Sequence, residues 1–98
     1  MNDKKCNLEK DLNSLLDEMG KIGPVMRGSV TIMGKKNKQP YFSVGIKGKT
    51  KVMYLGDKRA GIARKYSENY KRLLEIAEEM TIINMEILKL TSIESLFP

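Results

Sequence analysis

A regular alternation of apolar and polar residues over residues 41–47 limits this stretch to an extended strand. Phe42, Val44 and Ile46 fall on one side of it, as the two-residue period of a β-strand requires. Gly48 then offers the positive φ that a tight turn needs, and a second alternating run follows directly. The pattern predicts a β-hairpin.

A third strand is expected upstream, where β-branched residues cluster. Val30, Thr31 and Ile32 favour an extended backbone. Residues 34–40 then combine Gly, Asn and Pro without an apolar interruption, which is typical of a loop. Together these segments predict a three-stranded antiparallel sheet over residues 25–56.

Amphipathic stripes on both sides of the sheet predict two helices. Leucines at i, i+4, i+7 and i+8 indicate a helix over residues 1–20, with Gly20 at its C′ position. A longer helix is expected over residues 57–90, and the remainder, residues 91–98, is a tail. At about 1.5 Å per residue this second helix is roughly 50 Å long. The first helix therefore covers only part of it.

The length of 98 residues suits a single domain with a thin core. We therefore expect one α+β domain, residues 1–98, made of an N-terminal helix, a three-stranded antiparallel sheet and a long C-terminal helix. The distal half of the long helix is covered either by the first helix or by a second copy of the chain.

The second alternative rests on a heptad pattern in the long helix. Apolar residues recur there at spacings of three and four, interrupted by one Asn. An Asn at such a position fixes the register of paired helices at a cost in stability. A homodimer is thus expected to use the following residues: Leu73, Ala77, Met80, Asn84 and Ile87.

Charge is distributed unevenly along the chain. The formal net charge is +6, yet residues 21–72 hold 14 Lys and Arg against two acidic residues, and no acidic residue lies between Glu18 and Asp57. Both flanking segments carry a net negative charge. A polarised distribution of this kind indicates an anionic partner.

The basic residues are expected to converge on one surface of the sheet. If Phe42, Val44, Ile46, Val52 and Tyr54 face the core, the opposite face carries lysines, hydroxyls and a tyrosine ring, which suit contacts to phosphates, sugars and base edges. The loop and the start of the long helix add further cations. The candidate nucleic-acid contacts are Arg27, Ser29, Thr31, Lys35, Lys36, Lys38, Tyr41, Ser43, Lys47, Lys49, Lys51, Lys58, Arg59, Arg64 and Lys65.

Simpler interpretations of the same residues exist. Lysine is common on exposed strands because it discourages edge-to-edge aggregation, and the loop lysines also suit a solvated turn. A solvated face normally mixes both signs of charge, however. The absence of acidic residues therefore favours nucleic-acid contact.

Other classes of function have little support in the sequence. The chain has no His, its single Cys6 lies near the N-terminus, and no carboxylate pair stands out, so we expect neither catalysis nor a metal or cofactor site. No phosphate-binding glycine loop occurs. Without a signal peptide or an apolar membrane span, a cytoplasmic protein with no small-molecule substrate is expected.

Six short motifs carry a resemblance to a known family. In order they are Gly28-Ser29, Gly34-Lys35, Pro40-Tyr41, Gly48-Lys49-Thr50, Tyr54-Leu55 and Asn69-Tyr70. They resemble a family of small proteins of unknown function encoded near transposases and other bacterial mobile elements. Members often place a cysteine-rich knuckle between the first two strands, whereas this loop has no cysteine.

A looser similarity links residues 41–56 to the three-stranded arm-binding domain of phage and transposon integrases. In that domain a sheet inserts into the DNA major groove, and the similarity implies that Lys47, Lys49 and Lys51 contact DNA. The leading hypothesis is therefore an accessory protein of a mobile element or phage that binds DNA or RNA. The alternatives are an anti-defence, anti-CRISPR-like inhibitor of a host nucleoprotein complex, and a dimerising helical adaptor.

Overall fold

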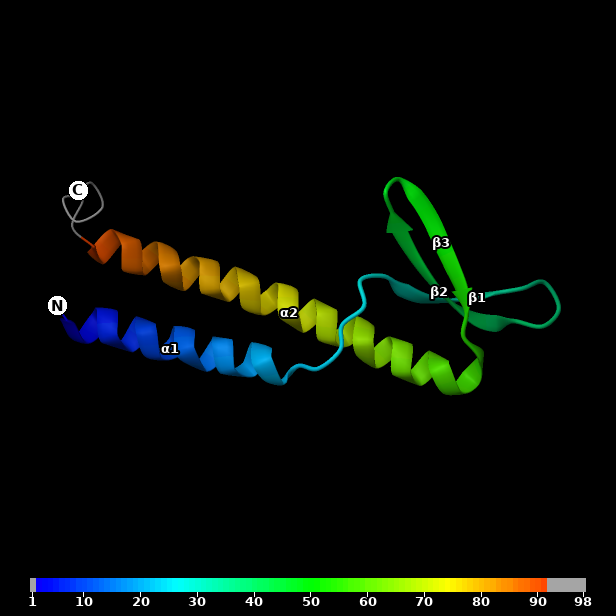
Figure 1. Ribbon diagram of the computed structural model, residues 1–98, viewed down its shortest axis with the longest axis horizontal. Helices are drawn as coiled ribbons and strands as arrows, with labels where there is room; N and C mark the ends of the chain where they lie inside the picture. The colour runs from blue at the N-terminus through cyan, green and yellow to red at the C-terminus, as the bar shows by residue number, and fades with distance from the viewer. Residues whose placement is uncertain (1, 92–98) are drawn as a thin grey trace. The chain divides into compact units, whose positions relative to one another are not determined.

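The computed structural model describes residues 2–91, which form two helices and three strands (Figure 1). The predicted α+β class and order of elements are confirmed, and the predicted tail lies, apart from Thr91, outside the described residues. Contacts group the chain into two compact units, a sheet unit, Gly23–Arg72, and a helical unit of residues 2–22 and 73–91. The elements are α1 Asn2–Lys21, β1 Ser29–Met33, β2 Gln39–Ile46, β3 Lys49–Tyr54 and α2 Gly56–Leu90.

The sheet has the antiparallel order β1-β2-β3. A loop of only two residues, Lys47 and Gly48, joins β2 to β3, and both have positive φ, 51° and 77°. Positive φ at both central positions is the requirement of a type I′ turn, whose twist matches that of the flanking strands. Ile46 consequently lies opposite Lys49.

This register corrects the predicted assignment of faces. Lys49 and Lys51 were expected beside Tyr41, with Val52 and Tyr54 in the core. That arrangement needs a three-residue loop. The shorter loop shifts β3 by one residue, and such a shift moves every side chain of a strand to the other face. Lys51 therefore lies opposite Val44, on the face that α2 covers, and Tyr54 lies opposite Tyr41 on the other face.

The core of the sheet unit forms where the first turns of α2 pack on β2. Phe42, Leu55, Ala60 and Ala63 are buried there, with relative exposures of 3–6%. The two alanines lie three residues apart on one side of the helix, and their small side chains allow the helix backbone to approach the Phe42 ring. Met26, Val30 and Val44 pack around this cluster.

Hydrogen bonds fasten the segment before β1 to α2. The Met26 N–H donates to the Tyr66 carbonyl at 3.1 Å, and the amide nitrogen of Asn69, a buried side chain, donates to the Pro24 carbonyl at 2.9 Å. The Ser67 hydroxyl donates to the Gly28 carbonyl at 3.1 Å. These bonds fix the point at which the chain enters the sheet.

In the helical unit, α1 lies alongside the last turns of α2 (Figure 1). The first helix thus belongs to the same unit as this part of α2. Ile76 is completely buried. The predicted helix end was slightly wrong, because Gly20 lies inside α1 and Gly23 is the residue with positive φ, 88°.

We predict that Gly28→Ala destabilises the sheet unit strongly. Gly28 has φ 150°, and a Cβ placed there would lie 2.5 Å from the Phe42 ring and 2.7 Å from the Ser43 carbonyl oxygen. Backbone strain and overpacking together should lower the free energy of unfolding by about 2–5 kcal/mol. Chemical denaturation measures this loss. Gly45→Ala is the matched control, since no atom lies within 4 Å of its added Cβ; equal stability of the two variants would contradict the structure.

The register can be tested by cross-linking the hairpin. Ser43 and Val52 lie directly opposite each other, three pairs beyond the pair Ile46–Lys49 that flanks the turn. This makes them a non-hydrogen-bonded pair, in which Cα atoms are about 4.5 Å apart. In a Cys6→Ser background, Ser43→Cys with Val52→Cys should form a disulfide readily on mild oxidation. Ser43→Cys with Met53→Cys should not, because those side chains point to opposite faces. The opposite result, seen by mass spectrometry, would indicate a different register.

Candidate nucleic-acid interface

The sheet unit exposes one complete face of the sheet, which we call the open face. Within this unit no other element covers it, because α2 packs on the other side. Its side chains are mainly hydroxyl-bearing and aromatic, and none of them is charged. The open face consists of Ser29, Thr31, Met33, Gln39, Tyr41, Ser43, Thr50, Val52 and Tyr54.

Two tyrosines on neighbouring strands pack against each other on the open face. The rings of Tyr41 and Tyr54 meet edge to face, with centroids 5.4 Å apart and planes at 69°, a favourable geometry for an aromatic pair. The Tyr54 hydroxyl donates to Oε1 of Gln39 at 3.3 Å. The Thr31 hydroxyl is buried and has no hydrogen-bond partner in the described structure. The face therefore presents both aromatic rings and polar groups.

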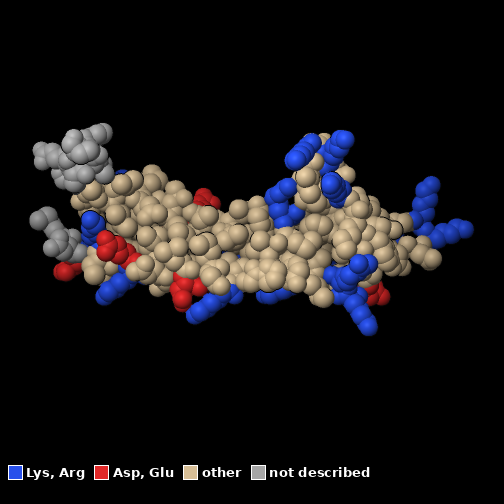
Figure 2. Space-filling model, in the orientation of Figure 1, with Lys and Arg blue, Asp and Glu red and all other residues tan. Residues whose placement is uncertain are grey.

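Six lysines of the β1–β2 loop and the β2–β3 hairpin lie off the open face, and we call them the lysine rim. Two of them, Lys49 and Lys51, are on the opposite face of β3. Figure 2 shows basic side chains gathered at the tip of the β2–β3 hairpin and at the β1–β2 loop. All six are exposed, and none of their side chains has an ion pair or hydrogen bond among residues 2–91. The lysine rim consists of Lys35, Lys36 and Lys38 in the loop and Lys47, Lys49 and Lys51 in the hairpin.

The two arginines next to the sheet have internal partners. Nη2 of Arg27 donates to the Gly45 carbonyl at 2.6 Å. The Arg59 guanidinium donates to the carbonyls of Leu55, at 2.7 Å, and Tyr54, at 3.0 Å, which secures the connection from β3 to α2. Both were predicted to contact nucleic acid, and the structure gives each a role in holding the sheet unit together.

The predicted cations of α2 do not share one location. Lys58, Arg64 and Lys65 are all exposed, and of the three Arg64 also lines a cleft between α2 and the start of β1. Sequence reasoning missed Gln39, Thr50, Val52 and Tyr54 as members of the open face. The sequence did contain a signal for these residues, the dipeptide Lys47-Gly48. A two-residue loop with Gly at its second position is a preferred hairpin connection, and predicting it would have assigned the faces of β3 correctly.

The residues predicted to form a dimer lie in the helical unit. Leu73, Met80 and Ile87 are partly buried, while Ala77 and Asn84 are exposed. Dimerisation stays a prediction. A separate set of large apolar side chains is exposed on α2: Leu74, Ile82, Met85, Leu88 and Leu90.

Two further properties concern residues 2–91 as a whole. Neither helix combines the length and apolar character needed to cross a membrane. No group of three or more His, Cys, Asp or Glu side chains is placed to hold a metal ion within this range.

The chain was compared with models of protein families, with curated proteins and with solved structures, and none of the three comparisons found a match.

Proposed function

We propose that this protein binds duplex DNA, with the open face in the major groove and the lysine rim on the flanking phosphates. The observation that carries the proposal is the separation of two sets of side chains: an uncharged face of hydroxyls, an amide and aromatic rings, and six unpaired lysines in the adjoining loop and hairpin that lie off this face. Contacts to phosphates position a protein on DNA, and contacts to base edges specify sequence. The lysine rim suits the phosphate contacts, and the open face suits the contacts to base edges.

The width of the sheet supports DNA over double-stranded RNA. Neighbouring strands lie roughly 4.8 Å apart, so the outer strands of this three-stranded sheet are roughly 10 Å apart, less than the width of the DNA major groove, about 12 Å. The major groove of A-form RNA is too narrow and deep for side chains to read. Ser, Thr and Gln side chains are common partners of base edges in the wider groove.

The proposal extends to the biological setting that the sequence resemblance implies. In that setting the chain is a DNA-binding accessory protein of a mobile element or phage. The resemblance to an integrase arm-binding domain supports the same mode of binding, a sheet inserted into the major groove.

The first test measures salt dependence. Affinity for a short duplex, followed by fluorescence anisotropy, should fall with salt, and each phosphate contact adds roughly −0.9 to the slope of log K against log salt. Replacing Lys47, Lys49 and Lys51 with Gln should therefore make the slope less steep by roughly 2.7 units. The control replaces Lys4, Lys5 and Lys10 of α1, which removes the same charge and should leave the slope unchanged. If both triple variants changed the slope equally, the hairpin lysines would not be the specific phosphate contacts that we propose.

The second test compares the two faces at adjacent positions. Val52 and Met53 are 51% and 49% exposed, and they point to opposite faces of β3. Val52→Glu places a carboxylate on the open face and should weaken DNA binding by about tenfold or more, equivalent to at least about 1.4 kcal/mol. Met53→Glu adds the same net charge on the other face and should weaken it much less.

Two outcomes of this comparison would overturn the proposal. Similar losses in both variants would show that only net charge matters. Selective binding of single-stranded nucleic acid, with the shallower slope of roughly −0.7 per phosphate, would indicate that bases stack on the tyrosines and that the sheet does not enter a groove. Circular dichroism of both variants confirms that the fold is retained.

A further inference from the structure

A second polar surface of the sheet unit is a cleft of about 240 Å³ at the β1 edge of the sheet. Residues 28–30 form one wall, and four residues of α2 form the other, Arg64, Ser67, Glu68 and Lys71. The volume exceeds that of a cavity of roughly 150 Å³ that accommodates a benzene ring. The cleft therefore has room for a ligand larger than an ion.

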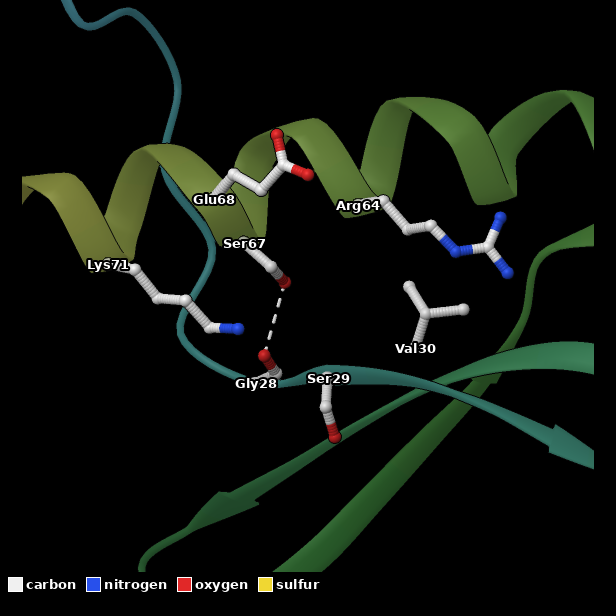
Figure 3. Close-up of a pocket in the computed structure, with 7 residues that line it drawn as sticks. All are labelled: Gly28, Ser29, Val30, Arg64, Ser67, Glu68 and Lys71. Carbon is white, nitrogen blue, oxygen red and sulfur yellow. Dashed lines mark hydrogen bonds between the residues drawn. The ribbon is translucent and has the colours of Figure 1, made fainter.

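Two cations face this space without a partner. In Figure 3 the Arg64 guanidinium extends over Val30, and the Lys71 ammonium group points towards Gly28. Neither side chain has an ion pair or hydrogen bond within the described part of the chain. An unpaired Arg offers a planar fork of donors and an unpaired Lys a point charge, and both groups bind phosphate.

The other polar groups of the cleft contribute less. The Ser67 hydroxyl already donates to the Gly28 carbonyl at 3.1 Å, so its hydrogen is engaged. The Ser29 side chain points away from α2, and the Glu68 carboxylate points away from β1 (Figure 3). The charged donors that remain directed into the cleft are those of Arg64 and Lys71.

The spacing of the two cations restricts the ligand. They lie seven residues apart on α2, which places their Cα atoms about 10 Å apart along the helix axis. Val30 and the hydrogen bond from Ser67 to Gly28 lie between them (Figure 3). This arrangement suits a ligand that carries two separated phosphate groups with a less polar part between them, which describes the sugar-phosphate backbone of a polynucleotide.

We propose that the cleft binds the backbone of a nucleic-acid strand, with Arg64 on one phosphate and Lys71 on the next. The choice of ligand rests on the proposed function, but the side chains are different from those of the open face and the lysine rim. The cleft would thus hold a strand segment beside the edge of the sheet, in addition to the contacts made through the open face.

Short probes test the cleft separately from duplex binding. A dinucleotide with an additional 5′-phosphate has two separated phosphates, a dinucleoside monophosphate has one, and inorganic pyrophosphate has two without a sugar between them. In NMR titrations the first probe should shift the amide signals of residues 28–30 and 67–71 and bind tightest. Tighter binding of pyrophosphate would overturn the strand assignment, and shifts confined to other residues would overturn the site.

Paired variants distinguish the cleft from general attraction to a basic surface. Arg64→Gln with Lys71→Gln should weaken binding of the phosphorylated dinucleotide by about tenfold. Lys58→Gln with Lys65→Gln removes the same charge from exposed positions that do not line the cleft and should change it by less than about twofold. Equal losses in the two double variants would overturn the proposal.

Glu68 provides a variant expected to increase binding. Glu68 lines the cleft, and its negative charge repels a bound phosphate although the carboxylate points away from β1. Glu68→Gln should therefore tighten binding of the dinucleotide by about two- to fivefold. A loss of binding would contradict an anion site. If these results hold while Val52→Glu leaves duplex binding intact, the cleft proposal is supported and the open-face proposal fails. If Val52→Glu weakens duplex binding but the cleft variants have no effect on the dinucleotide, only the cleft proposal fails.

Discussion

The two-residue turn at Lys47 and Gly48 is the constraint on which the organisation of the sheet depends. Because both residues adopt positive φ, Ile46 pairs with Lys49, and every later residue of β3 takes its side from that pair. One more residue in the loop would exchange Val52 and Tyr54 for Lys51 and Met53 on the open face. The turn therefore decides whether the exposed surface is basic or uncharged.

The types and order of the elements could be predicted because their patterns are local. The alternation around Phe42 and the leucine stripe of α1 each specify a period within a few residues. The faces of β3 were harder to predict, because both of its sides are amphiphilic: Val52 and Tyr54 alternate with Met53 and lysines that have long aliphatic stems. When neither side is clearly apolar, turn geometry sets the register, and a single residue reverses the result.

The candidate contact residues also differ in how much of their placement could be predicted from the sequence. Charge along the sequence located the cations of the loop and hairpin, but it could not separate lysines that remain free from arginines that hold the fold. Arg59 and Arg27 donate to backbone carbonyls, and these partners depend on how the strands and α2 come together. The placement of Arg64 and Lys71 on one wall of a cleft depends likewise on which side of α2 packs on β1.

The corrected register changes what the acid-free segment accomplishes. A face that carried its own lysines would bind phosphates and bases with the same side chains, so that a gain in affinity would also alter specificity. In the proposed complex the cations of the loop and the hairpin would provide long-range attraction and positioning, and the polar and aromatic side chains of the strands would discriminate between sequences. Substitutions on the open face can then change the sequence recognised while the rim maintains affinity. The proposed division is consistent with the packing of Tyr41 against Tyr54 and the hydrogen bond from Tyr54 to Gln39, since groups that read base edges must be positioned more precisely than groups that neutralise phosphates.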